Sequence, residues 1–279
     1  TMIVYGIATE TSIGRLFIAG LLPGLLLTVL FMAWSLYTAK RNGFDFSASN
    51  VGYTFKQKLE VLPRVIPFLV IIAGVLFVLY GGVATPSEAA GVGALFVLIL
   101  VAVIYKVYQP AKIWAIISDS MKESVMILMI IAASALFSYT LSSLFVTQAV
   151  AEQIVSLDAN RWVIMAMINV FLLIAGFFLP PVAVILMTAP ILLPIIEQMG
   201  FDPYWFAVIF TINMEIGLIT PPVGLNLYVI NGIAPEISLP TILKGAFPFM
   251  LCMVVAIVIL CIFPDIVTFL PNYMMGAAQ

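Results

Sequence analysis

The sequence contains no histidine, and charged residues of either sign are scarce. Only 9% of the 279 residues are charged, whereas a soluble domain carries about a quarter. Without histidine, no histidine general base, catalytic triad or histidine-ligated metal can form. The formal net charge of −2 offers no basic surface for nucleic acid. These absences exclude histidine-dependent chemistry, and we expect no nucleic-acid partner.

Cysteine is equally scarce, with Cys252 and Cys261 as the only two. They lie nine residues apart in one apolar run, on opposite faces of an expected helix. They can therefore neither bridge each other nor form a metal site. What the sequence has in abundance is apolar residues, which make up 64% of the chain. A water-facing surface cannot be built from so few polar residues, so we expect an integral membrane protein.

Long apolar runs predict an all-α, multi-pass membrane protein embedded in a lipid bilayer. A bilayer-spanning helix needs about 20 apolar residues. Lys and Arg gather in 40–64 and again in 106–122, so the positive-inside rule places these loops in the cytoplasm and the 84–88 turn on the other side. We expect spans at 16–39, 65–84, 88–108, 123–146, 161–179 and 242–263, with a broken region at 182–232.

Two of the connecting stretches are amphipathic. The segments 56–66 and 111–121 each place apolar residues on one helical face. Such a pattern predicts a helix lying in the membrane interface. Helices that simply pack on the bundle are the alternative interpretation.

Two proline pairs interrupt the apolar runs, and each follows a glycine. Proline lacks the N–H that would bond the carbonyl four residues earlier. Pro180 therefore frees the carbonyl of Gly176, and Pro221 frees that of Gly217. In hydrocarbon, a freed carbonyl must find another partner or line a cavity.

Freed carbonyls suit an alkali cation, and the hydroxyl of Thr220 could add another oxygen. Half-helices that begin after the prolines bring partial positive charge to the same space. A cation beside an anion is the arrangement that a sodium-coupled organic-acid carrier requires. Simple proline kinks repaired by neighbouring helices are the alternative. We expect the substrate next to the breaks, near Pro181, Val182, Pro221, Pro222 and Asn226.

Glu215 lies two residues before Gly217 in an apolar stretch, where a charge facing lipid would be costly. It could carry a coupling proton, tune the site or pair with another subunit. A proton-coupled carrier that uses Glu215 is thus one alternative function, and a structural or ion-conducting subunit is another. An intramembrane carboxylate enzyme would need paired acids, and only Glu215 lies clearly at membrane depth. We expect neither an enzyme nor any cofactor other than coupling sodium ions.

With these residues in hand, the chain resembles the large membrane subunit of tripartite ATP-independent periplasmic (TRAP) transporters. The run EIGLITPPVGLNLYVINGIA at 215–234 is highly specific for that family. Supporting segments are SIGRLFIAGLLPGLLL at 12–27, GGVATPSEAAGVGAL at 81–95 and ILMTAPILLPII at 185–196. The resemblance covers only the C-terminal two-thirds of the family, and Thr1 is not an initiator residue, so we expect a longer protein.

The resemblance implies sodium-driven import of a small organic acid across the bacterial inner membrane by an elevator motion. A periplasmic solute-binding protein would deliver the substrate, and a small membrane subunit would help to hold the scaffold. Family members contain two inverted repeats, each with a re-entrant hairpin and an interrupted helix, and this chain would carry the second. The family's second sodium site maps onto Gly176, Gly217, Thr220 and Val223.

The resemblance also divides the chain into expected regions. Residues 1–64 would hold a transmembrane helix, the basic loop and a scaffold arm, and 65–160 further spans with amphipathic connectors. Residues 161–241 would form the transport region, and 242–279 the C-terminal span. One departure concerns Leu179-Pro180-Pro181, where many members carry an acidic residue before the proline. This neutral tip leaves the identity of the substrate open.

Overall fold

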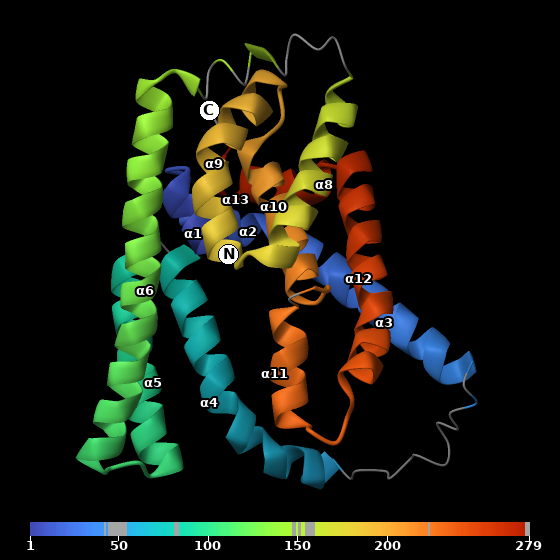
Figure 1. Ribbon diagram of the computed structural model, residues 1–279. Helices are drawn as coiled ribbons and strands as arrows, with labels where there is room; N and C mark the ends of the chain where they lie inside the picture. Colours follow the sequence, from blue (N-terminus) through green and yellow to red (C-terminus); the bar gives the residue numbers. More distant parts are fainter. Residues whose placement is uncertain are drawn as a thin grey trace. The chain divides into compact units, whose positions relative to one another are not determined.

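The computed structural model describes residues 1–41, 43, 55–80, 84–146, 149, 152–153, 160–222 and 224–276 (Figure 1). These residues form helices joined by turns, and no strand occurs among them. Two compact units are present. The larger comprises Thr1–Tyr37 with Ile127–Gln279, and the smaller comprises Thr38–Met126.

The described residues contain twelve helices, taken here in chain order. The first six are α1 (Met2–Ala8), α2 (Ile13–Ala19), α3 (Leu21–Arg41), α4 (Phe55–Tyr80), α5 (Pro86–Tyr105) and α6 (Pro110–Ser143). The others are α8 (Arg161–Phe178), α9 (Pro181–Gln198), α10 (Pro203–Leu218), α11 (Leu225–Ile233), α12 (Leu239–Ile262) and α13 (Asp265–Met275).

Six helical segments among the described residues are long and apolar enough to cross a membrane. They are Ile13–Arg41, Ser87–Tyr105, Pro110–Leu141, Arg161–Phe178, Pro181–Gln198 and Leu239–Ile262. The expected all-α class is confirmed for the described residues, and the six segments agree with a multi-pass membrane protein. The expected span at 65–84 is represented by a shorter apolar stretch, Val65–Val78.

The two amphipathic stretches are helical, as predicted, but neither is a separate element. Residues 56–66 belong to the 26-residue helix α4, and residues 111–121 belong to the 34-residue helix α6. Each stretch continues without a break into the apolar segment that follows it. The predicted helical character of both stretches is therefore confirmed, and their place in the membrane interface stays a prediction.

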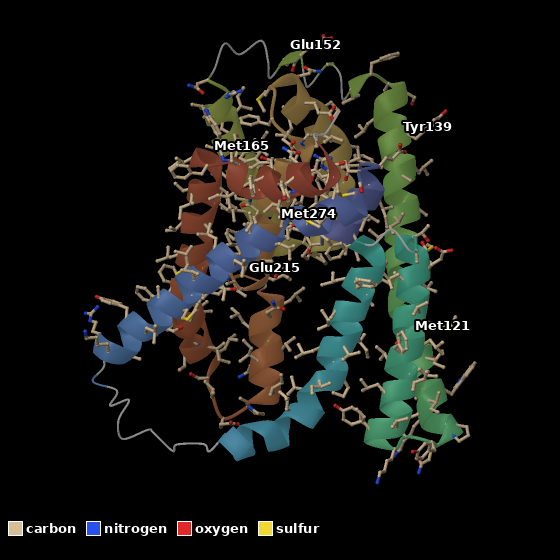
Figure 2. The ribbon with its side chains drawn as sticks, turned by 180° about the vertical axis from the view of Figure 1, so that it is seen from behind. Met121, Tyr139, Glu152, Met165, Glu215 and Met274 are labelled. Carbon is tan, nitrogen blue, oxygen red and sulfur yellow. The ribbon has the colours of Figure 1, made fainter. Side chains whose placement is uncertain are left out.

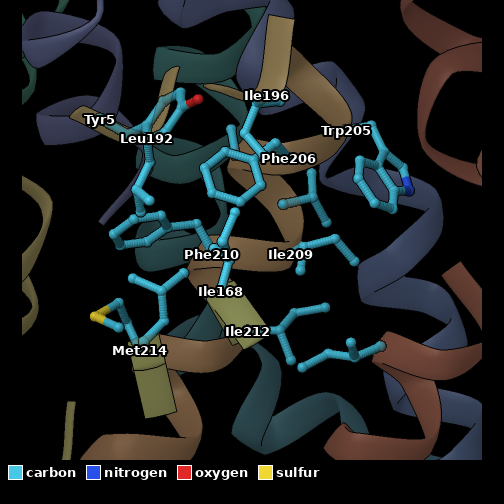
Figure 3. Packing of buried hydrophobic residues seen from close by; sticks show 14 of the residues in the cluster. Tyr5, Ile168, Leu192, Ile196, Trp205, Phe206, Ile209, Phe210, Ile212 and Met214 are labelled. Atoms are coloured by element: carbon cyan, nitrogen blue, oxygen red, sulfur yellow. The ribbon is translucent and has the colours of Figure 1, made fainter. Parts of the chain in front are cut away.

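The core of the larger unit is built around α10, which carries an aromatic stripe. The Phe206 and Phe210 rings are buried and meet edge to face at 5.8 Å, and the Tyr5 ring of α1 lies 6.0 Å from Phe210 (Figure 3). The Tyr5 hydroxyl donates to the carbonyl of Pro203 at 3.2 Å. Burial raises the pKa of Tyr5 far above its ordinary value, so it remains a neutral donor.

A pair of asparagines joins α8 to α10 inside this core. The Asn213 side-chain amide donates to Oδ1 of Asn169 at 2.6 Å and to the Ile209 carbonyl at 3.0 Å. Asn213 is fully buried, and its own Oδ1 has no hydrogen-bond partner among the described residues. The pair fixes the register of the two helices whose far ends form the candidate site.

Candidate functional site

The first helix break lies between α8 and α9. α8 ends at Phe178, and Leu179 adopts an extended conformation while its N–H donates to the Ala175 carbonyl. Pro180 follows, and α9 begins at Pro181. Because Pro180 has no N–H, the Gly176 carbonyl receives no helical hydrogen bond from that position. The first of the two expected breaks is therefore present where the proline pair predicted it.

The second break follows α10. The Thr220 N–H donates to the Gly217 carbonyl in a long 3.3 Å bond, and the Thr220 hydroxyl donates to the Ile216 carbonyl at 2.6 Å. The proline positions predict a free Gly217 carbonyl, but the Thr220 N–H occupies one of its lone pairs. The second lone pair of that oxygen stays available. Because the Thr220 hydroxyl donates its proton to the Ile216 carbonyl, its oxygen can only accept a hydrogen bond or coordinate a cation.

The two breaks meet through their glycines. A Cβ atom built on Gly217 would lie 2.5 Å from the Gly176 carbonyl oxygen and 2.9 Å from the Gly176 Cα. Both glycines are buried. The absence of a side chain at Gly217 thus allows the end of α10 to touch the end of α8, which brings two helix-terminal carbonyls together.

A cavity of about 120 Å³ lies at this meeting point. Both helix ends contribute to its wall, and so does the start of α11. Its side chains are apolar, so any polar contact must come from backbone groups. The lining residues are Gly176, Phe177, Phe178, Leu179, Pro180, Gly217, Leu218, Gly224 and Leu225.

Two helix N-termini adjoin the cavity. Pro180 caps α9, and Gly224 caps α11 in the left-handed conformation, with φ 52°. The first backbone N–H groups of a helix have no partner within the helix and carry partial positive charge. The C-terminal ends of α8 and α10 and the N-terminal ends of α9 and α11 therefore adjoin the same cavity.

The residues expected near a substrate lie around this cavity but are not among those that line it. Pro181 and Val182 are half-buried in the first turn of α9, whereas Pro221, Pro222 and Asn226 are exposed. Thr220 lies next to Gly224, which lines the cavity. The Thr220 carbonyl oxygen is 3.3 Å from the position of a Cβ built on Gly224. Val223 lies outside the described residues. Sequence reasoning had not placed Gly224 at the site, although a glycine two residues after a proline pair is a signal for a special backbone conformation.

Glu215 occupies an unusual position on α10 (labelled in Figure 2). Its neighbours Met214 and Ile216 are buried, whereas Glu215 itself is exposed on the surface of the larger unit. It is therefore one turn or less from the Gly217 contact but points out of the core that holds the asparagine pair.

These features agree with the family that the sequence resembles. The family profile of the tripartite ATP-independent periplasmic transporter, DctM component, matches residues 1–266. The chain belongs to this TRAP transporter family. Similarity extends over the whole described site, since the match includes both helix breaks.

Several curated relatives of this TRAP family member share about a third of its residues. The large permease protein of the C4-dicarboxylate TRAP transporter from Pseudomonas aeruginosa is 34% identical over 98% of this chain and 63% of the relative. The sialic acid permease from Vibrio cholerae is 28% identical over 100% of this chain and 64% of the relative. The ectoine permease from Halomonas elongata is 32% identical over 96% of this chain and 62% of the relative. The chain thus spans a little under two thirds of the length of these relatives.

Proposed function

We propose that the protein is the membrane subunit of a sodium-coupled transporter that imports a small organic acid. The observation that carries the proposal is the meeting of two helix breaks at Gly176 and Gly217 around one cavity walled by backbone. Hard, neutral carbonyl oxygens suit sodium, and the adjoining N-termini of α9 and α11 suit a carboxylate. Gly176, Gly217 and Thr220, with Val223, are the proposed sodium ligands.

The relatives support the substrate class. Their names specify a C4-dicarboxylate, sialic acid and ectoine, each of which carries a carboxylate. The proposal includes delivery by a periplasmic solute-binding protein, a small membrane subunit as partner, and residence in the bacterial inner membrane. It also includes an elevator motion of two inverted repeats, of which this chain contributes the second.

Thermal unfolding of the intact transporter in sodium, potassium and choline chloride at equal ionic strength tests the sodium site. A ligand that binds only the native state stabilises it by about 2.7 kcal/mol at a hundredfold excess over Kd. We expect stabilisation by sodium alone. Thr220→Val should weaken it, because the hydroxyl oxygen is removed at nearly constant volume, whereas Thr220→Ser should preserve it.

Proton coupling through Glu215 is the second candidate function, and its favouring observation is the exposure of this carboxyl group on an otherwise buried helix. It predicts equal stability in the three salts. It further predicts transport that depends on a pH gradient and is lost in Glu215→Gln. Equal stability in the three salts would reject the sodium site.

A further inference from the structure

A second cavity, of about 280 Å³, lies at the opposite end of α8 from the helix breaks. Its wall combines the start of α8, the turn between α9 and α10, and the segment from the α12–α13 turn into α13. The polar side chains that line it are Arg161, Asp202, Thr268 and Asn272. None of the residues of the proposed sodium site lines it, so the two cavities are separate.

The position of this cavity along the chain puts it at the boundary between hydrocarbon and water. Arg161 is the first residue of one apolar segment, Arg161–Phe178, and Asp202 lies four residues after another, Pro181–Gln198. Pro264, which also lines the cavity, lies two residues after the end of a third, Leu239–Ile262. The start of α8 and the end of α12 lie on the same side of the larger unit (Figure 1). Arginine and tryptophan are the usual anchors at that boundary, where phospholipid headgroups lie.

An aromatic wall holds the Arg161 guanidinium in place. Its central carbon lies 5.6 Å from the centre of the Trp162 ring and 5.2 Å from that of Phe201. The Phe201 and Trp205 rings stack at 5.2 Å behind it. A guanidinium that rests on ring faces keeps its N–H edge available for a bidentate anion such as a phosphate. No carboxylate within the described part of the chain forms an ion pair with it.

Asn272 adds a second donor to the same cavity. The buried Arg15 guanidinium, which lies 5.0 Å from the Tyr204 ring centre, donates to Oδ1 of Asn272. Oδ1 of Asn272 accepts this bond, and its amide nitrogen keeps N–H groups that can donate to the cavity. The Arg15 Nε has no hydrogen-bond partner among the described residues. A buried, incompletely paired cation next to the wall favours a negative charge in the cavity.

Asp202 gives the cavity a negative group beside these donors. Its Oδ1 accepts the backbone N–H groups of Tyr204 at 2.7 Å and Trp205 at 2.9 Å and so caps α10. Both bonds end on Oδ1, which leaves Oδ2 for a cation. One wall therefore suits an anion and the other an ammonium group, within an aromatic surround.

We propose that this cavity binds the headgroup of a zwitterionic aminophospholipid of the phosphatidylethanolamine class. The phosphodiester accepts hydrogen bonds from Arg161 and Asn272, and the ammonium group pairs with Asp202. The exposed part of Trp162 covers the glycerol and the first part of an acyl chain. A purely anionic headgroup would leave Asp202 without a cation and is therefore the poorer ligand.

Native mass spectrometry of the delipidated intact transporter tests the proposal. The probes are phosphatidylethanolamine, phosphatidylglycerol with the same acyl chains, and inorganic phosphate. We expect wild type to retain phosphatidylethanolamine in preference to phosphatidylglycerol. Arg161→Gln should weaken the binding of phosphatidylethanolamine about tenfold, the effect of one lost charge-assisted hydrogen bond. Asp202→Asn keeps an oxygen for the α10 cap and should abolish the preference between the two lipids.

Arg41→Gln is the matched control, because Arg41 is an exposed cation at the end of α3 and does not line this cavity. It should leave lipid retention unchanged. Equal losses in Arg161→Gln and Arg41→Gln would overturn the proposal, and so would equal retention of the two lipids by wild type. Displacement of the lipid by millimolar inorganic phosphate would overturn the assignment to a lipid and indicate a soluble phosphate instead. If Arg161→Gln does not fold, Arg161→Lys replaces it. Lysine keeps the positive charge but lacks the paired N–H donors of the guanidinium, so it must still weaken retention of phosphatidylethanolamine.

Discussion

The Cα of Gly217 rests against the backbone of Gly176, so that a methyl group on Gly217 would lie 2.5 Å from the Gly176 carbonyl oxygen. Backbone at the end of α8 cannot yield as a flexible side chain can. We therefore expect Gly217→Ala to lower the free energy of unfolding of the intact transporter by about 1–3 kcal/mol, the usual cost of overpacking. Denaturation followed by circular dichroism measures this. The higher helix propensity of alanine offsets less than about 1 kcal/mol of it.

Gly176→Ala and Gly245→Ala are matched controls for that substitution. A Cβ on Gly176 would meet the Met214 Cε at 3.4 Å and the Gly217 Cα at 3.6 Å, which are ordinary contacts. A Cβ on Gly245 in α12 would meet nothing within 4 Å. Neither variant should be destabilised, and the helix propensity of alanine should raise the unfolding free energy of each by up to about 1 kcal/mol. If all three substitutions cost the same, the close approach of α8 and α10 would be disproved.

The hydrogen bond from Asn213 to Asn169 gives a second prediction. Asn213→Leu leaves the Oδ1 of the half-buried Asn169 without its partner, and we expect a cost of about 1 kcal/mol, the lower end for an unsatisfied acceptor. The double variant Asn169→Leu/Asn213→Leu removes both groups and should be closer to wild type than Asn213→Leu alone. A double-mutant cycle on unfolding free energies measures the coupling. Strictly additive losses would show that the two side chains do not interact.

Glu215 should behave in the opposite way from Asn213, although the two residues are neighbours on α10. Its carboxyl group is exposed, and it has no hydrogen bond or ion pair within the described part of the chain. Glu215→Gln should therefore change the unfolding free energy by no more than about 0.5 kcal/mol. Any loss of uptake in reconstituted vesicles would then reflect function rather than folding. A large loss of stability would reveal a partner for this carboxylate.

The sequence allowed the class of the fold and the place of the two breaks to be predicted, for identifiable reasons. Apolar runs must be helical in lipid, and a proline always removes one N–H, so the break after Gly176 could be located by counting. The convergence of Gly176 and Gly217 could not be derived in this way, because it depends on how α8 packs against α10. The resemblance to a family supplied that pairing.

Other features of the site depend on local geometry that residue types alone do not determine. Thr220 was expected to contribute its hydroxyl oxygen, but the sequence did not predict that this hydroxyl donates its proton to the Ile216 carbonyl. The Gly217 carbonyl accepts a bond from the Thr220 N–H, because the last turn of α10 tightens before the prolines. Similarly, the helical period predicts the amphipathic face of 56–66 but not whether α4 bends or continues there.

Gly224 provides the last prediction, because two separate constraints act on it. Its φ of 52° is a left-handed conformation that costs other residues about 1–2 kcal/mol. A Cβ there would also lie 2.9 Å from the Leu227 Cδ1 and 3.3 Å from the Thr220 carbonyl oxygen. Gly200→Ala separates the two, since Gly200 has φ 73° but a Cβ on it would meet nothing within 4 Å. We expect Gly224→Ala to lower the unfolding free energy more than Gly200→Ala does.

The additional loss of stability in Gly224→Ala arises where Thr220 meets the start of α11. Gly224→Ala should therefore also reduce the stabilisation by sodium, which Gly200→Ala should leave intact. Equal unfolding free energies and equal sodium responses in the two variants would mean that Gly224 is required for its backbone conformation alone.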